Sequence, residues 1–169
     1  MSLGKKGRRS MRYALNRFAA ALFVLTLVCI MSSTAHAQAS STSQIPAADL
    51  LQPSELVQIL KSSTEVKPLV LQVGSHVLYA QAHIPASEYA GPAGQAAGLR
   101  ALEGRVGKLD RNLFVVLYCG CCPWGKCPNI APAYKQLRSL GFTHIKVLHI
   151  ADNFGTDWVD KGYPVAKGR

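Results

Sequence analysis

The sequence lacks an apolar stretch long enough to cross a membrane. Its longest apolar run, Phe18 to Met31, has about 14 residues, whereas a spanning helix needs about 20. Six basic residues and no acidic one precede this run, and Ala35-His36-Ala37 follows it. This order predicts a signal peptide of residues 1–37 that is cleaved after Ala37, with an uncleaved anchor as the alternative. We therefore expect a periplasmic or secreted protein, exported by the Sec or the twin-arginine route and not anchored in the membrane after cleavage.

Acidic residues are also scarce, with nine Asp and Glu against 19 Lys and Arg. The net charge is +10 for the whole chain, but the predicted signal peptide carries six of the basic residues, and the remaining 132 residues have a net charge of +4. They contain no basic stripe with interleaved aromatic residues, so nucleic acid is not an expected partner. A chain of this length can bury one hydrophobic core without disulfide bonds.

Cysteine is almost absent outside one short segment. One of the five cysteines lies in the predicted signal peptide, and the other four lie within nine positions of the stretch YCGCCPWGKCPN, residues 118–129. These four are Cys119, Cys121, Cys122 and Cys127. A run this dense in thiols indicates a nucleophilic sulfur with neighbours, a metal site or a disulfide bond.

The apolar pattern of the remaining chain predicts an α/β fold. Residues 38–52 are expected to form a polar linker and residues 53–169 one domain. Three short apolar runs predict buried strands at residues 69–73, 113–118 and 144–150, and helical spacing predicts helices that begin near residues 53, 95 and 129. This alternation predicts a three-layer, doubly wound fold, in which helices flank a mostly parallel central sheet.

The cysteine cluster directly follows the predicted strand 113–118 and directly precedes a predicted helix. In open α/β sheets, ligands bind beyond the carboxyl ends of the strands. A helix N-terminus at this place presents backbone N–H groups and the positive end of its dipole. We therefore expect a thiolate at the end of the strand to be stabilised and its pKa to be lowered.

Six segments in this order resemble the rhodanese-like sulfurtransferase domain, of an exported bacterial type with a cysteine-rich loop. They are PSELVQILK, LVLQV, AHIPAS, LFVVLYC, LRSLGFTHIKVL and DWVDKGYPV, and they extend from about residue 53 to the C-terminus. The resemblance implies that Cys119 is the catalytic nucleophile. It would take a sulfane sulfur from a donor such as thiosulfate, hold it as a persulfide and pass it to a thiophilic acceptor, without a cofactor.

The resemblance also implies a substrate-binding loop after the nucleophile, in which Lys126 and backbone N–H groups hold the anionic donor. The loop residues are Gly120, Cys121, Cys122, Trp124, Gly125 and Lys126. Two departures from the family's pattern stand out: Gln72-Val73-Gly74 replaces the usual Asp-Val-Arg, and the loop is longer and lacks its usual arginine. A related phosphatase is not expected, because Gly125 lies where an arginine would bind phosphate.

Three interpretations of the four cysteines remain open. In the first, Cys121, Cys122 or Cys127 resolves a persulfide on Cys119 as a disulfide. In the second, two or more of the four thiolates bind Zn or Cu(I). In the third, a disulfide between Cys122 and Cys127 stiffens the loop. The functions that follow are a thiosulfate-type sulfurtransferase or, alternatively, a non-catalytic metal-binding module or a thiol–disulfide redox protein.

Three further residues have predicted places. His83 is expected to be structural rather than a catalytic base, and Trp158 is expected to lie in the core of the last helix. Trp124 is expected either to cap the cysteine-rich loop or to pack beside it. The expected partners of the site are a small sulfur donor and a thiophilic acceptor.

Overall fold

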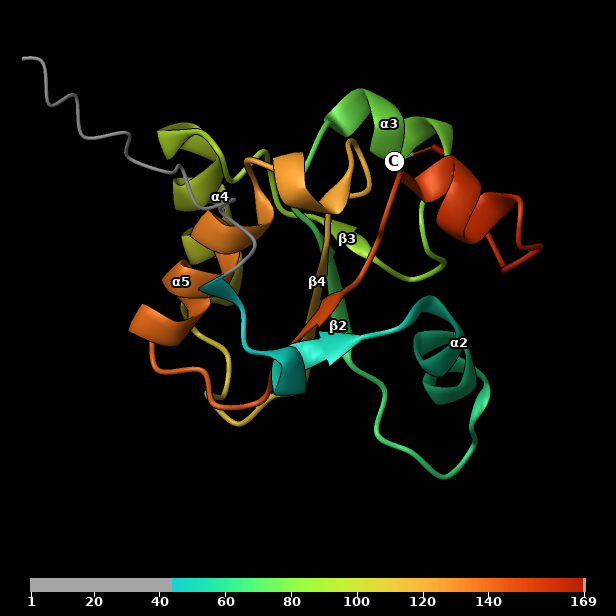
Figure 1. Ribbon diagram of the computed structural model, residues 1–169. Helices are drawn as coiled ribbons and strands as arrows, with labels where there is room; N and C mark the ends of the chain where they lie inside the picture. Colours follow the sequence, from blue (N-terminus) through green and yellow to red (C-terminus); the bar gives the residue numbers. More distant parts are fainter. Residues whose placement is uncertain (1–43, 169) are drawn as a thin grey trace, which may run out of the picture. The chain divides into compact units, whose positions relative to one another are not determined.

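The computed structural model describes residues 44–168, in which five parallel strands form a sheet with helices on both faces (Figure 1). The predicted signal peptide and the first residues of the predicted linker lie outside the described residues. Within the described range, no helix combines the length and the apolar character that a membrane span requires.

The five strands lie in the order β1-β5-β4-β2-β3, and every neighbouring pair is parallel. Their bounds are β1 (Leu50–Leu51), β2 (Leu69–Gln72), β3 (Glu88–Tyr89), β4 (Val115–Tyr118) and β5 (Ile145–Leu148). All four residues of the central strand β4 are buried, as a strand covered on both faces requires. Gln72 pairs with Tyr118, so β2 and β4 end at the same edge of the sheet.

The helices that connect these strands complete the three layers. The α-helices are α2 (Pro53–Lys61), α3 (His76–Gln81), α4 (Ala96–Val106) and α5 (Ile130–Ser139). The described residues also form three shorter helical segments. Two are 3-10 helices, η2 (Ala47–Asp49) and η3 (Trp124–Lys126), and the third is one turn of π-helix, η4 (Gly155–Val159). The backbone N–H of Gln52 donates to Glu55 Oε2 at 2.7 Å, which caps α2 at the start that the sequence predicts.

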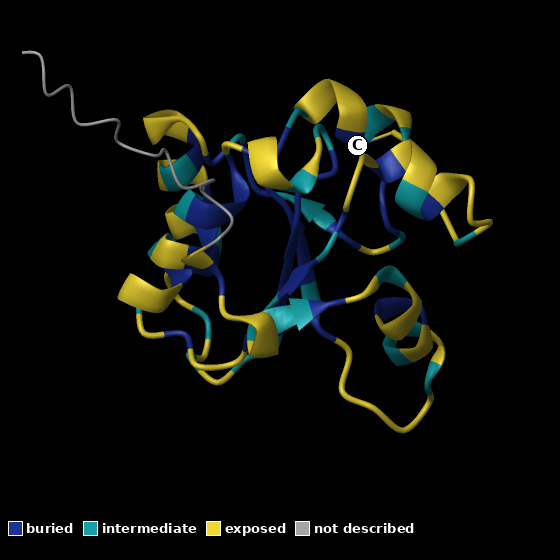
Figure 2. Cartoon of the chain, viewed as in Figure 1, coloured by how far each residue is buried: buried dark blue, intermediate teal, exposed yellow. Residues whose placement is uncertain are grey.

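Successive residues of β4 point to opposite faces of the sheet and divide the core into two clusters. Val115 and Leu117 pack with apolar residues of α4 and α5, whereas Val116 and Tyr118 pack with residues of α2 and with Trp158 of η4. Figure 2 shows the same arrangement, with buried strands in the centre and helices exposed on their outer sides. The three-layer fold that the sequence predicts is confirmed, and its sheet is entirely parallel.

Two strands, β1 and β3, and one α-helix, α3, are not among the elements that the sequence predicts. β1 lies inside the predicted linker 38–52, where Ile45 is also buried, so this part of the linker belongs to the domain. The two edge strands have two residues each, and α3 has six, which is too short for a periodic pattern.

Candidate functional site

Side-chain contacts on the face of the sheet that packs against α2 and η4 hold the carboxyl end of β4 in place. Its last residue, Tyr118, is buried, and its hydroxyl accepts from the backbone N–H of Ile84 and lies 3.0 Å from Ser87 Oγ. Burial raises the pKa of Tyr118, so the phenol stays neutral and keeps these bonds. Cys119 follows directly and is therefore presented from a fixed backbone.

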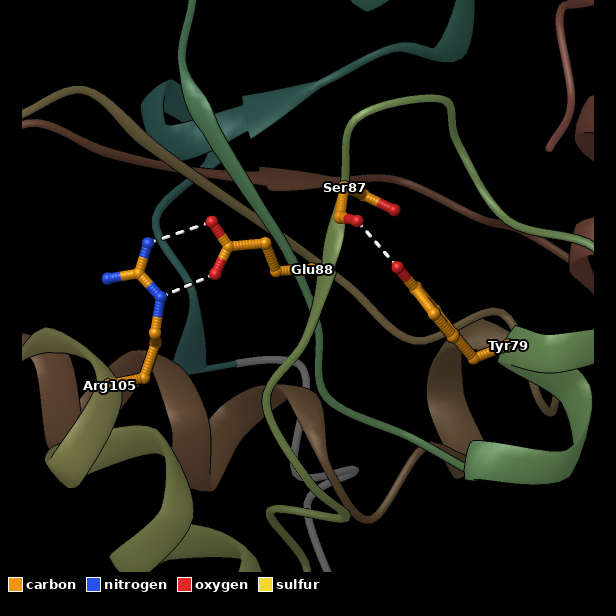
Figure 3. Close-up of polar contacts among 4 residues, drawn as sticks. All are labelled: Tyr79, Ser87, Glu88 and Arg105. Carbon is orange, nitrogen blue, oxygen red and sulfur yellow. Dashed lines mark hydrogen bonds and ion pairs between the residues drawn. The ribbon is translucent and has the colours of Figure 1, made fainter. Parts of the chain in front are cut away.

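Two further contacts fix Ser87, the partner of Tyr118, and the adjacent Glu88, as Figure 3 shows. The hydroxyl of Tyr79, in α3, donates to the backbone carbonyl of Ser87, and the Glu88 carboxylate of β3 binds both Nε and Nη2 of Arg105, in α4. His83 is buried, stacks on Tyr79 and contacts the backbone carbonyl of the same residue. These contacts agree with the structural role expected for His83.

Cys119 packs against the residues that replace the usual Asp-Val-Arg. A methyl group added to Gly74 would lie only 2.6 Å from Cys119 Sγ, so the sulfur occupies the space that a side chain would need. The Gln72 amide is buried between the two segments: its Nε2 donates to the Cys119 carbonyl, and its Oε1 accepts from the Gly74 N–H at 3.0 Å. Gln72 and Gly74 therefore fit the site, although the sequence suggests only the loss of a charged pair.

The four cysteine sulfurs lie close together after β4. Cys119 Sγ is 3.0 Å from Cys121 Sγ, which is 3.3 Å from Cys122 Sγ. The sulfurs of Cys119, Cys121 and Cys127 all lie within 4.8 Å of one another. Among the described residues, no disulfide bond joins any of these sulfurs, and the disulfide between Cys122 and Cys127, one of the three interpretations, stays a prediction.

Asn129 is a site residue that the sequence analysis misses. Its side chain is buried, with 7% of its surface exposed, and its Nδ2 lies 3.3 Å from Cys119 Sγ and 3.8 Å from Cys121 Sγ. Its Oδ1 accepts from the backbone N–H of Gly94 at 2.8 Å, which fixes the amide so that Nδ2 faces the sulfurs. The available signal was its place directly before a helix, where Asn is a favoured cap residue.

The negative charge of the cluster rests on Cys121 rather than on Cys119. Hydrogen bonds from Cys119 and Cys127 lower the pKa of Cys121, while the bond that Cys119 donates to Cys121, together with burial, raises the pKa of Cys119. Burial also raises the pKa of Cys122. The expected lowered pKa at the end of the strand is therefore wrong for Cys119, because sulfurs this close share one negative charge.

The N-terminus of α5 also lies elsewhere than expected. The backbone N–H groups of Asn129 and Ile130 contact the sulfur of Cys127. The hydrogen bond with Cys119 and these N–H groups act to lower its pKa, but the hydrogen bond with Cys121 and burial outweigh them, and the pKa of Cys127 is raised. Cys119 instead receives the backbone N–H of Cys121. Because four further residues separate Cys122 from Cys127, the longer loop brings Cys127, and not Cys119, to the helix end.

Two cavities border the cysteines. One, of about 380 Å³, lies between α3, the end of β4 and η4, and its walls include Cys119, Cys121, Gln81 and Phe154. The other, of about 480 Å³, includes His76, Gln95, Cys121 and Asn129 in its walls. Only 4% of Cys119 is exposed, but the residue lines the first cavity, and Cys121 lines both.

The other predicted loop residues have different places. Gly120 needs its left-handed conformation (φ +70°), and a methyl group there would meet Phe154 Cβ at 2.7 Å. Trp124 packs with its ring edge-on to His149, 4.9 Å away, so it is packed beside the loop and lines neither cavity. Gly125 and Lys126 are exposed, and neither lines one of these two cavities. The expected role of Lys126 in holding an anionic donor therefore has no support from these cavities.

The structure resembles solved rhodanese-like domains. It matches the crystal structure of the Alr3790 protein from Anabaena sp. with a TM-score of 0.54 and 19% identity, over 70% of this chain and 92% of that one. The solution structure of the rhodanese-like domain from the same protein matches with a TM-score of 0.52 and 19% identity, over 70% and 79% of the two chains. The fold is rhodanese-like. The BH2092 protein from Bacillus halodurans matches with a TM-score of 0.53 and 20% identity, over 69% of this chain and 75% of that one.

These comparisons support the fold alone, because the identities are low. No protein-family model and no curated protein matches the sequence. This fold carries a cysteine cluster at the carboxyl end of its central strand. The cluster of several sulfurs around Cys119 is the feature that any functional account has to explain.

Proposed function

We propose that this chain is a sulfurtransferase that carries sulfane sulfur as a persulfide on Cys119. The observation that carries the proposal is the pair of cysteines at the end of β4: Cys119 Sγ and Cys121 Sγ lie 3.0 Å apart, and both residues line the same cavity of about 380 Å³. A proton held between them leaves one negative charge on the pair, and the cavity gives a small donor access to it.

The first half-reaction uses this contact. When a donor such as thiosulfate enters the cavity, the proton of Cys119 moves to Cys121, and the Cys119 thiolate attacks the outer sulfur of the donor. The sulfur–sulfur bond of thiosulfate breaks, and sulfite leaves with the bonding electron pair. The product is a persulfide on Cys119.

The second half-reaction returns the site to its starting state. A thiophilic acceptor such as cyanide attacks the outer sulfur of the persulfide, and the sulfur–sulfur bond breaks with its electron pair on Cys119. Cys119 then takes back the proton that Cys121 holds. Asn129 Nδ2 and the backbone N–H of Cys121 donate to the sulfur of Cys119, and they stabilise the negative charge in both half-reactions.

The 3.0 Å contact also favours a second candidate function, thiol–disulfide exchange. In the absence of an acceptor, the proton on Cys121 passes to the outer sulfur of the Cys119 persulfide, and the Cys121 thiolate attacks the inner sulfur. The sulfur–sulfur bond of the persulfide breaks, and hydrosulfide leaves with the electron pair. The two thiols are oxidised to a Cys119–Cys121 disulfide, and the transferred sulfur is reduced to hydrosulfide. The two functions differ in their products. Sulfur transfer gives thiocyanate when cyanide is present, and thiol–disulfide exchange gives hydrosulfide when it is absent.

The proposal includes the place of the reaction. With residues 1–37 removed as a signal peptide, the chain would act in the periplasm or outside the cell, where the donor has to be an extracytoplasmic sulfur compound. Cell fractionation, together with the mass of the purified mature chain, checks this part separately. A chain that begins at Met1 and stays in the cytoplasm would contradict it.

The experiment that tests the proposal is thiocyanate formation from thiosulfate and cyanide by the reduced chain. We expect Cys119→Ser to lower turnover more than about 1,000-fold, because it removes the nucleophile. Asn129→Ala is expected to lower turnover about 100-fold, because it removes a donor to the charged sulfur. Asn112→Ala is the matched control, since Asn112 is exposed and bonds only with surface groups. A wild-type rate in Cys119→Ser would refute the proposal.

A further inference from the structure

Three of the four loop sulfurs form a compact group that sulfur transfer on Cys119 does not require. The sulfurs of Cys119, Cys121 and Cys127 lie within 4.8 Å of one another, and they come from two places in the chain: the end of β4 and the residues before α5. A sulfur carrier needs one nucleophile and at most one resolving thiol. Cys127 has no part in either half-reaction, and yet it is buried against the other two.

The spacing of the three sulfurs suits a single metal ion. Thiolate–metal bonds are about 2.3 Å long, so three sulfurs around one ion in a plane lie roughly 4 Å apart. The observed limit of 4.8 Å includes this value, and the contact of 3.0 Å between Cys119 and Cys121 would have to lengthen by about 1 Å on binding. Side-chain rotation of Cys121, which is only partly buried, can supply a change of this size while Cys119 keeps its place.

The ligand set is entirely soft. Among residues 44–168, no histidine or carboxylate joins the three sulfurs. Cys122 also lies outside the group, although its Sγ is 3.3 Å from that of Cys121. Thiolate ligands bind both Cu(I) and Zn, but zinc in structural sites almost always takes four ligands, so a set of three sulfurs favours Cu(I).

The surroundings of the sulfurs provide hydrogen-bond donors for the charge of such a complex. Three thiolates around one monovalent cation have a net charge of −2. Asn129 Nδ2 lies 3.3 Å from Cys119 Sγ and 3.8 Å from Cys121 Sγ, and its orientation is fixed by Gly94. The backbone N–H groups of Asn129 and Ile130, at the positive end of α5, contact the sulfur of Cys127. Each sulfur therefore has a donor, as ligands of protein metal sites usually do.

We propose that Cys119, Cys121 and Cys127 form a three-coordinate thiolate site for Cu(I). Binding converts the three cysteines to thiolates, and any protons they carry pass to the solvent. The copper keeps its oxidation state, so no oxidant or reductant is involved. Since Cys119 is also the proposed sulfur carrier, a bound copper ion and a persulfide exclude each other. The site is independent of the proposed sulfur transfer and would exist even in a chain that transfers no sulfur.

The test is a Cu(I) titration of the reduced, metal-free full chain without oxygen, in competition with the chromophoric chelator bicinchoninate. We expect one Cu(I) per chain and an increase in ultraviolet sulfur-to-copper absorption. Cys121→Ser and Cys127→Ser are each expected to weaken binding more than about 100-fold, and Asn129→Ala about 10- to 100-fold. Cys122→Ser is the discriminating variant. A three-coordinate site predicts that this variant binds Cu(I) within about 3-fold of the wild-type affinity, which is a smaller effect than removing a residue that hydrogen-bonds to a ligand.

X-ray absorption at the copper edge of the loaded wild-type chain keeps the proposal testable if a variant fails to fold. The expected result is three sulfur ligands at a single distance and no nitrogen or oxygen ligand. A fourth sulfur, a nitrogen or oxygen ligand, or an equal loss of affinity in Cys122→Ser would overturn the three-coordinate site. Preference for Zn over Cu(I), or no stoichiometric binding, would also overturn it. Neither readout involves sulfur transfer, so a failure here is distinct from a failure of the proposed function.

Discussion

Replacing Gly74 with alanine tests the position of the Cys119 sulfur. The added methyl group would lie 2.6 Å from Cys119 Sγ and 3.1 Å from Gln72 Nε2. Non-bonded heavy atoms are in favourable contact at about 3.5 Å or more, so the sulfur has to move by about 1 Å. Cys119 and Gln72 are both buried, and the surrounding core has little room for this movement. We expect the free energy of unfolding to fall by about 1–3 kcal/mol.

The same displacement affects the proposed reaction. A nucleophile misplaced by about 1 Å loses about 100-fold in rate, so thiocyanate formation by Gly74→Ala should fall by this factor. Gly104→Ala is the matched control. Gly104 is exposed in the middle of α4, and a methyl group there would meet nothing within 4 Å. The control should raise the free energy of unfolding by about 0.5–1 kcal/mol, because alanine favours helix, and leave the rate unchanged.

Urea denaturation and initial rates of thiocyanate formation measure the two effects on the same preparations. If Gly74→Ala unfolds at the same urea concentration as the wild type and transfers sulfur at the same rate, the sulfur of Cys119 does not lie above Gly74. The geometry of the site would then be wrong. A loss of stability without a loss of rate would contradict only the link between this contact and the reaction.

Three further predictions concern backbone strain and ionisation. Ala86 has a left-handed conformation (φ 62°), which costs a non-glycine residue about 1–2 kcal/mol. Ala86→Gly should therefore raise the free energy of unfolding by about 0.5–1 kcal/mol, and a lower free energy of unfolding in urea denaturation would contradict this. Cys121→Ser should shift the pH profile of sulfur transfer to higher pH, because the thiol whose pKa is lowered is removed; an unchanged profile would separate Cys121 from the reaction. Hydrogen bonding to Arg105 lowers the pKa of Glu88 below 4.5, so its stabilisation is present above pH 4.5 and is lost as the pH falls through the lowered value. Both side chains are partly exposed, so Glu88→Gln should remove only about 0.2–1 kcal/mol, and urea denaturation at pH 6 and pH 3 should show a smaller difference than in wild type.

The sequence predicts the parts of the fold that have a clear apolar pattern. β2, β4 and β5 lie in short apolar runs, and α2, α4 and α5 have helical spacing, so the sequence predicts each of them. The edge strands β1 and β3 are two-residue elements stabilised by pairing with their neighbours, β5 and β2, and no local pattern distinguishes them. The same pairing explains why part of the predicted linker belongs to the domain.

The site was predicted in place but not in its contacts. The order of strand, cysteines and helix correctly places Cys119 at the carboxyl end of β4. The contact of Gly74 with Cys119 joins residues that follow two neighbouring strands, and the contact of Asn129 depends on how the long loop returns to the sheet. Which sulfur is ionised depends on distances among Cys119, Cys121 and Cys127. None of these can be read from spacing along the chain.

The most direct measurement is the location of the transferred sulfur. The reduced chain is treated with thiosulfate, free thiols are alkylated, and the peptides that contain each cysteine are identified by mass spectrometry. The account predicts one added sulfur atom, on Cys119, which is lost when cyanide is added and is recovered as one thiocyanate per chain. An added sulfur found only on Cys121 or Cys122, or no added sulfur with any sulfane donor, would contradict the proposed role of Cys119.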